Sequence, residues 1–401
     1  MNNSQNRSFF FGVLVILSSS VVRLGGCLYL PAIPAIGTGL NISDSDMAST
    51  VTFYFVVFAL SSLLTGPFSD AFGRKPLVLC GTLFFIAGSV CCYMSNSYFS
   101  LLSGRLLQAF GASMIPGTGR AMIRDHCNDL QVVSLMGWLA VLGSVMFVGA
   151  PTLGGILTTT FGWRSNFSFL SIFSCIVVFL IFFYLPETLS KKLRTNISLK
   201  DSVKNYLKML MVPRFSLVIL PLFLAFIFQG AYLGSASFIF IKEFHFSPEN
   251  FGYINVILLI GLLLGRNIAV KNSKKNSAKK AFWIGAILAP VASLSFIALI
   301  FSHQFQIILL LLGLLLFSTS IGIIIPLSMK VSISAFSVRR GETASLQAFV
   351  ALFGSAVGAL LVSLSMHFIS NSAVINIFAS ISIALACLLP FSVKLGIKYI
   401  K

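Results

Sequence analysis

The sequence predicts an all-α integral membrane protein with twelve transmembrane helices in two six-helix bundles. Composition is the first reason: of the 401 residues, 57% are hydrophobic and only 9% are charged, whereas a soluble domain carries about 25% charged residues. Apolar runs of about 20 residues, the length that crosses a bilayer as a helix, recur along the whole chain. The longest hydrophilic interruption, 186–213, leaves six such runs on either side.

The apolar runs fix where the helices are expected. They are 8–34, 47–68, 76–95, 98–121, 132–157, 164–185, 214–241, 249–270, 280–302, 304–329, 341–369 and 372–395. The predicted organisation is an N-terminal six-helix bundle (1–185), a cytoplasmic central loop (186–213) and a C-terminal six-helix bundle (214–401). The first run could pass for a signal peptide, but it continues towards Pro31 with no convincing cleavage site, which favours a first transmembrane helix.

The central loop contains one segment with a helical pattern. Ser198–Val212 has helical spacing with lysines on one side. Such a helix lies in the interface of an anionic membrane, with its apolar face towards the acyl chains. We therefore expect it on the membrane surface; a docking site for a partner is the alternative.

Basic residues predict the orientation of the chain. There are 28 Lys and Arg against 10 Asp and Glu, a net charge of +18. Nearly all of the bases fall in connections on one side; the other side carries Arg164 and Lys242, while Arg23 and Arg105 lie inside spans. Because cytoplasmic loops hold the excess of Lys and Arg, both termini and the central loop are expected in the cytoplasm. The same distribution, in short loops between apolar runs, argues against a nucleic-acid partner.

The sequence gives no support for an enzyme or a metal protein. The seven cysteines are scattered, mostly within apolar runs, and no Cys/His spacing suits a metal. No Ser/His/Asp grouping or phosphate-binding loop is present. We expect no metal and no cofactor.

Two motifs in the first half carry a resemblance to a known family. Gly66–Pro76 (GPFSDAFGRKP) resembles the loop between helices two and three of the major facilitator superfamily at its Gly, Asp, Gly, Arg and Lys positions. Arg105–Gly111 (RLLQAFG), followed by Arg120–Asp125, resembles the fourth-helix motif. The resemblance implies the major facilitator fold, in which substrate binds between two halves that give alternating access to it.

Three further segments narrow the resemblance. Pro151–Gly155 (PTLGG) is similar to the fifth-helix antiporter motif, Phe161–Arg164 (FGWR) to the start of helix six, and Tyr29–Ile36 (YLPAIPAI) to the Bcr/CflA drug-resistance group, which includes bicyclomycin resistance proteins. The strong matches cover about the first 190 residues, whereas the second half agrees mainly in hydropathy.

The resemblance implies a gate at the cytoplasmic side. Asp70 would face the positive N-terminal end of a helix in the other half, the eleventh, and Arg74 would bridge to Asp125 at the end of helix four. The alternative is that Arg74 and Lys75 only fix topology. The gating residues implied are Gly66, Asp70, Gly73, Arg74, Asp125, Pro151, Gly154 and Gly155.

A second group is expected to act in coupling or to line the substrate cavity. Arg105 lies about 10 Å from the periplasmic end of its helix, where a charge needs a wet cavity or a partner. Hydrogen bonding to carbonyls of helix one is the structural alternative. Relatives carry an Asp where this chain has Cys27, and none of its ten acids falls in the middle of a span. The candidates are Arg23, Cys27, Arg105, Gln108, Gln229 and Tyr232.

The expected function is export of small drug-like compounds by alternating access, coupled to H+ movement into the cell. A metabolite facilitator or importer on the same fold, and a non-transporting membrane sensor, are the alternatives. The expected partners are a small-molecule substrate, protons and the lipid bilayer. A monomer in the bacterial inner membrane is expected.

Overall fold

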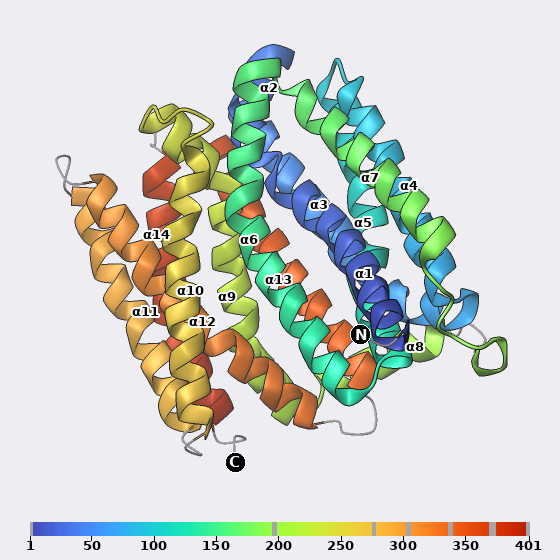
Figure 1. Cartoon of the computed structure of the whole chain (residues 1–401). Helices are drawn as coiled ribbons and strands as arrows, with labels where there is room; N and C mark the ends of the chain where they lie inside the picture. Colours follow the sequence, from blue (N-terminus) through green and yellow to red (C-terminus); the bar gives the residue numbers. More distant parts are fainter. Residues whose placement is uncertain are drawn as a thin grey trace. The chain divides into compact units, whose positions relative to one another are not determined.

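A computed structural model of the chain describes residues 3–194, 199–274, 278–301, 306–335, 340–368 and 374–397. These residues are helical apart from short connections, and no strand occurs among them (Figure 1). The all-α fold is thereby confirmed. Apolar helices satisfy their own backbone hydrogen bonds, which is the condition for crossing a bilayer.

A long helix lies at each of the twelve expected spans. These helices are α1 (Asn3–Cys27), α3 (Asp44–Phe72), α4 (Arg74–Tyr93), α5 (Tyr98–His126), α6 (Asp129–Phe161), α7 (Arg164–Tyr184), α9 (Pro213–Ser237), α10 (Phe251–Lys274), α11 (Ala278–Phe301), α12 (Gln306–Ala335), α13 (Arg340–Phe368) and α14 (Val374–Ile397). The shorter elements are η1 (Leu30–Ala32), α2 (Ile33–Leu40), η2 (Lys191–Leu193), α8 (Leu199–Leu210) and the π-helical turn η3 (Phe238–Glu243). Helix α8 forms within the segment predicted to lie on the membrane.

Helix α5 differs from the other long helices in composition. Eleven helices of the described chain are long and apolar enough to cross a membrane, and α5 is not among them. It contains Arg105, Gln108, Arg120 and Arg124 besides many small residues. Most of its residues from Gly104 to Ile123 are buried, so neighbouring helices rather than lipid surround Arg105 and Gln108, whereas Arg120 and Arg124 are exposed. The sequence predicted a span here with Arg105 inside it, and the burial of that polar group against other helices explains why α5 is less apolar than the other long helices.

The first span is interrupted, which the sequence analysis did not anticipate. Helix α1 ends at Cys27, and η1 and α2 follow before the chain turns. Pro31 and Pro34 lie at the first positions of these two short helices. Proline lacks the amide hydrogen that would continue α1 but fits the first turn of a new helix.

Contacts divide the chain into two compact units. The first unit contains 1–42, 56–202 and 248–252, and the second contains 43–55, 203–247 and 253–401. Helix α3 therefore contributes its beginning to the second unit and the rest to the first. Two six-helix bundles separated at the central loop stay a prediction.

Glycines set the closest helix contact of the first unit. Helices α4 and α5 pack together, with Gly81 opposite Gly111 and Gly88 opposite Gly104. A Cβ atom on Gly81 would lie 2.7 Å from the Gly111 carbonyl oxygen, and one on Gly88 would lie 2.5 Å from that of Gly104. Small residues allow two backbones this close in membrane helices, where van der Waals packing drives association.

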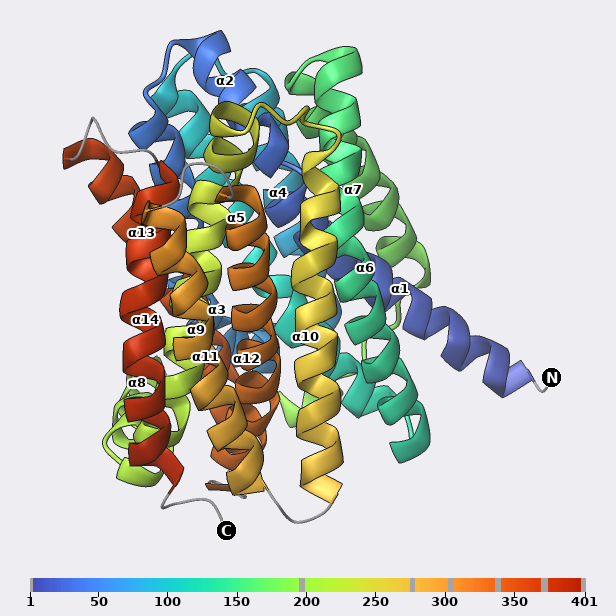
Figure 2. The same ribbon diagram turned by 90° about the vertical axis from the view of Figure 1, so that its left-hand side faces the viewer.

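The second unit is held by similar contacts around α9. Helices α9, α11, α12 and α14 lie side by side (Figure 2), and α13 packs on α9. Gly354 of α13 lies against the carbonyl oxygen of Phe223 in α9. The rings of Phe228 and Phe317 stack with centroids 3.9 Å apart.

Candidate functional site

The segment Gly66–Pro76 is not an open loop. Helix α3 continues through Pro67 to Phe72, and α4 starts at Arg74, so that Gly73 is the one residue between them. Gly73 has φ of +106°, a conformation that L side chains rarely adopt. A Cβ atom at this position would also collide with the Glu187 carboxylate. The tight junction therefore requires glycine for both reasons.

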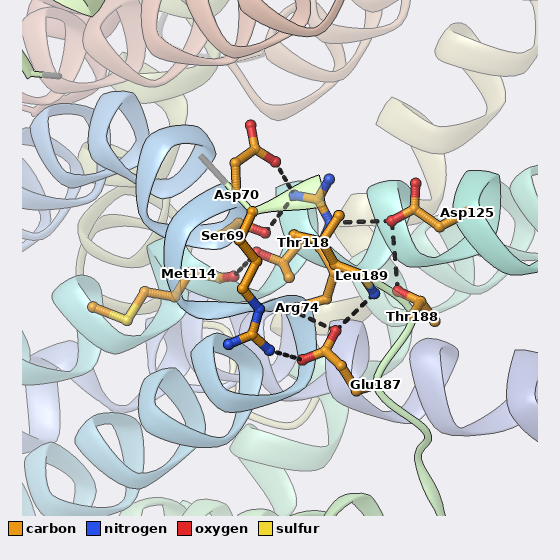
Figure 3. Close-up of polar contacts among 10 residues, drawn as sticks. Ser69, Asp70, Arg74, Met114, Thr118, Asp125, Glu187, Thr188 and Leu189 are labelled. Carbon is orange, nitrogen blue, oxygen red and sulfur yellow. Dashed lines mark hydrogen bonds and ion pairs between the residues drawn. The ribbon is translucent and has the colours of Figure 1, made fainter. Parts of the chain in front are cut away.

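Arg74 is the centre of the polar cluster at this junction (Figure 3). Its Nη1 atom lies 2.6 Å from Oδ1 of Asp70 and donates a hydrogen bond of 2.7 Å to the hydroxyl of Ser69. Its Nε atom donates to Oδ2 of Asp125 at 3.1 Å. One guanidinium thus connects the end of α3 and the start of α4 to the end of α5.

Glu187 completes the cluster, and the sequence analysis missed it. Its Oε1 atom accepts a hydrogen bond of 3.0 Å from the backbone N–H of Arg74, at the first turn of α4. A carboxylate at this position satisfies an otherwise free N–H and complements the positive end of the helix dipole. The Oε2 atom lies 3.8 Å from Arg194. The only sequence signal was an acid placed directly after α7.

The expected ion pair between Arg74 and Asp125 is present, and its gating role stays a prediction. Asp70 has Arg74 as its partner in this structure; the expected contact of Asp70 with another helix also stays a prediction. Lys75 donates a hydrogen bond of 2.8 Å to the carbonyl oxygen of Phe182. Gly66 lies half-buried within α3.

The small residues of α6 make backbone contacts in the first unit. Ala150 and Pro151 are buried within the helix. A Cβ atom on Gly154 would collide with the carbonyl oxygen of Leu28, and one on Gly155 with that of Pro248. These two positions therefore hold α6 against two other segments at backbone distance.

Arg105 is almost completely buried, with 2% of its surface exposed. Its Nη1 atom donates to the carbonyl oxygen of Gly25 at 3.1 Å and to Oε1 of Gln108 at 2.8 Å. Gln108 donates in turn to the hydroxyl of Ser89. The guanidinium also lies over the ring of Tyr29, 4.2 Å from its centroid. A carbonyl group, an amide group and an aromatic ring, rather than a carboxylate, thus surround this charge in these contacts.

Comparison with known proteins decides the family. The model of the Major Facilitator Superfamily matches residues 10–359. The chain belongs to the major facilitator superfamily. Members of this superfamily are transporters rather than enzymes, so the protein is a multi-pass membrane transporter that moves small molecules.

Individual relatives of this transporter include drug-resistance proteins. It is 28% identical over 265 residues to a bicyclomycin resistance protein homolog of Haemophilus influenzae, covering 64% of this chain and 66% of the relative. It is 31% identical over 161 residues to the multidrug resistance protein MdtL of Escherichia coli, covering 40% and 41%. The chain aligns with less than two thirds of the length of these two curated relatives. Among solved structures, a D-xylose-proton symporter matches with a TM-score of 0.72 at 16% identity, covering 95% of this chain and 97% of that one.

The other candidate residues of this transporter occupy different environments. Arg23 is exposed, although both of its neighbours in α1 are buried, and its guanidinium lies against Gly143 of α6. Cys27 is a half-buried free cysteine one turn further along α1. In the second unit, the hydroxyl of Tyr232 donates to Oδ1 of Asn255 at 2.8 Å, and both side chains are buried. Gln229 is half-buried on the same helix. The roles of these residues in coupling or binding stay predictions.

Arg164 fixes a connection in the first unit. It donates hydrogen bonds to the carbonyl oxygens of Tyr93 and Ser95, at 3.2 and 2.8 Å, and its guanidinium lies over the ring of Trp163. The FGWR motif thereby holds the link between α4 and α5. Arg164 therefore has a structural role, because its charge binds backbone carbonyl groups rather than only influencing the orientation of the chain in the membrane.

An ion pair that was not predicted from the sequence lies in the second unit. Lys242 of η3 contacts Oδ1 of Asp44 at 2.5 Å. The next residue, Glu243, accepts hydrogen bonds from the first backbone N–H groups of α14, those of Val374 and Ile375. The start of α3 is also joined to α13, because the hydroxyl of Ser363 donates to the carbonyl oxygen of Ser45 at 3.0 Å.

No group of three or more His, Cys, Asp or Glu that could hold a metal occurs in the part of the chain described.

Proposed function

We propose that this transporter exports small drug-like compounds by alternating access, coupled to the movement of H+ into the cell. Similarity to two drug-resistance proteins supports the substrate class. We place it as a monomer in the bacterial inner membrane with both termini and the central loop in the cytoplasm. The bias of Lys and Arg towards one set of connections supports this orientation.

The polar cluster at Arg74 is the observation that carries the proposal. Its ion pair with Asp125 joins side chains that are 12% and 29% exposed, and pairs of this kind contribute about 0.2–1 kcal/mol. Such a contact is weak enough to break and reform in each transport cycle. Because Arg74 also contacts Asp70 at the end of α3, breaking its contacts would loosen the ends of α3, α4 and α5 relative to one another, as opening of a cytoplasmic gate requires.

Close packing of α6 supports the same proposal. Gly154 and Gly155 bring this helix to backbone distance from Leu28 and from Pro248. Contacts without side chains between them can seal a passage against water and still separate as rigid surfaces, since no interdigitated side chains need to be withdrawn. We assign Pro151, Gly154 and Gly155 to this seal.

A second function, a facilitator that moves a metabolite without protons, is favoured by one observation. Cys27 stands where the resemblance to the Bcr/CflA group implies a carboxylate, and the ten acids of the sequence all lie near the ends of spans or outside them. Proton coupling generally uses a titratable group within the membrane. In the first proposal, an acid at the end of a span, such as Asp125, has to bind and release the proton.

Dye efflux from cells tests transport and the gate together. Cells that express the protein are loaded with ethidium or carboxyfluorescein, and initial efflux is measured at several dye concentrations. Asp70→Asn is expected to lower the maximal rate about threefold to tenfold, equivalent to about 0.7–1.4 kcal/mol in the barrier, with the half-saturating concentration unchanged. Asp46→Asn, an exposed carboxylate in the first turn of the same helix, is the matched control. Equal maximal efflux rates in the two variants would mean that the charges of the cluster only set the orientation of the chain in the membrane.

A further inference from the structure

Two arginines in the first unit carry a positive charge into the helices without a carboxylate partner among the described residues. Arg23 lies in the middle of the first span, Phe10–Leu40, and Arg120 lies in α5 about 9 Å before its end. Both side chains are exposed. The guanidinium groups of Arg23 and Arg124 lie within electrostatic range of Arg120. Helices α1 and α5 pack together, so the three charges belong to one region of the unit.

The helix face around Arg23 does not have the composition of a lipid-facing surface. At helical spacing it carries Ser19, Gly26 and Cys27, all of them half-buried. A Cβ atom on Gly26 would meet nothing within 4 Å. Lipid-facing positions are apolar, whereas polar residues within a span face the bundle interior or a water-filled cavity.

The face of α5 around Arg120 has the same character. Ser113, Gly117 and Arg124 share it at helical spacing with Arg120. A Cβ atom on Gly117 would meet only a methyl group of Thr65, at 3.7 Å. The glycine on the same helix face as each arginine therefore leaves open space beside the helix backbone.

No ion pair of the described residues joins Arg23 or Arg120 to an acid of the first unit. Asp70 and Asp125 contact Arg74, and Glu187 caps α4 and faces Arg194. A guanidinium in the middle of a span, such as that of Arg23, is unfavourable unless a partner or water compensates it. Arg105 obtains that compensation from Gly25, Gln108 and Tyr29; the hydrogen bonds and ion pairs of the described residues give none to Arg23 or Arg120.

We propose that the transported compound is a small organic anion whose carboxylate, sulfonate or phosphate group binds between Arg23 and Arg120. This inference rests on the transport function proposed above and names its substrate class. Guanidinium groups bind such oxyanions through paired hydrogen bonds. Gly143 supports the site, because the Arg23 guanidinium lies directly over it, where a Cβ atom would be 3.1 Å from Cζ.

An anionic substrate has a consequence for the driving force. The inside-negative membrane potential pushes anions out of the cell, and each negative charge gains a concentration ratio of about 50-fold per 100 mV. Export of an anion therefore obtains a driving force even where helix one lacks a carboxylate to carry protons.

The test uses two fluorescent dyes of opposite charge, carboxyfluorescein and ethidium, in vesicles that contain the purified full-length protein. The potential is set with valinomycin and potassium gradients. The wild-type protein is expected to move carboxyfluorescein faster when the dye-containing side is negative. Arg23→Gln is expected to lower this flux about tenfold, because one charge-assisted hydrogen-bonding partner is lost, and Arg120→Gln to lower it as well. Arg23→Lys should keep most of the flux, and Arg214→Gln, an exposed arginine at the start of α9, is the control.

Each outcome decides between the two proposals. Carboxyfluorescein flux that falls in Arg23→Gln and is retained in Arg23→Lys supports the anion site, since general misfolding would remove both. Movement of ethidium alone, or equal carboxyfluorescein flux in wild type and Arg23→Gln, overturns the anion site and leaves transport intact. If neither dye moves with the wild-type protein, both proposals fail.

Discussion

The Nε atom of Arg74 donates a hydrogen bond of 3.1 Å to the Asp125 carboxylate, joining the start of α4 to the end of α5. The same guanidinium contacts Asp70 of α3 at 2.6 Å. The backbone N–H of Arg74 is held separately by Glu187. A single residue thus depends on three carboxylates, and each of them can be changed without touching the others.

A double-mutant cycle on Arg74 and Asp125 tests whether this contact acts as a pair. Arg74→Gln and Asp125→Asn are each expected to lower the transport rate, and their combination is expected to do less than the sum of the two. The coupling energy should be about 0.5–1 kcal/mol, the size found for partly exposed ion pairs. Initial rates of dye efflux in the four proteins give this value. Strictly additive effects would show that the two residues act independently.

The glycines of α6 allow a matched comparison within one helix. Gly155→Ala is expected to destabilise the protein by about 1–3 kcal/mol, because its Cβ atom would collide with the carbonyl oxygen of Pro248. Gly149→Ala is expected to be neutral or stabilising by about 0.5–1 kcal/mol, since nothing lies within 4 Å of its Cβ position and alanine favours the helix. Thermal unfolding of the purified proteins in detergent measures both. A similar melting temperature for the two variants would contradict the packing described for α6.

Glu187 is expected to stabilise the start of α4. Glu187→Gln keeps the size of the side chain but removes the charge that faces the helix N-terminus and Arg194. The loss should be about 0.5–1 kcal/mol, from the weaker interaction with the helix dipole. Thermal unfolding at low and high salt is the measurement, and the difference from wild type should shrink in high salt. A difference that salt leaves unchanged would rule out the charge as its cause.

Cys27→Asp tests the interpretation of helix one. The new carboxylate would lie one turn from Arg23, within reach of its guanidinium. We expect stronger dependence of transport on a pH gradient, because a titratable group is restored within the span. The measurement is dye flux at equal and unequal pH in vesicles, with Cys27→Asn as the uncharged control. Identical pH dependence of the two variants would mean that this position has no part in coupling.

The sequence predicted the helices well because apolar runs of about 20 residues mark most of the segments that can cross a bilayer. Each long helix begins and ends within a few residues of its expected bounds, except that α1 stops at Cys27 before two prolines. The pairing of Arg74 with Asp125 was also predicted, from the resemblance of two motifs. Composition did not reveal that α5 is mostly buried, because burial depends on which helices surround it.

Contacts between distant parts of the chain could not be read from the sequence. Glu187 meets the N–H of Arg74 across 113 positions, and Lys242 meets Asp44 across 198. From the sequence, Lys242 was interpreted only as one of the two basic residues in the connections on the less basic side of the membrane. The segment Gly66–Pro76 was expected as a loop between two helices, and the single-residue junction at Gly73 was not predicted, because Pro67 lies inside α3.

The most direct test of export coupled to proton influx is dye flux in vesicles with an imposed pH gradient and the membrane potential clamped at zero. Vesicles that contain the purified protein are loaded with carboxyfluorescein or ethidium, and the external medium is made acidic or kept at the internal pH. We predict faster efflux of dye with the acidic medium, and loss of this acceleration in Asp125→Asn. Protein-dependent efflux at the same rate with and without the gradient would contradict proton exchange and identify the protein as a facilitator.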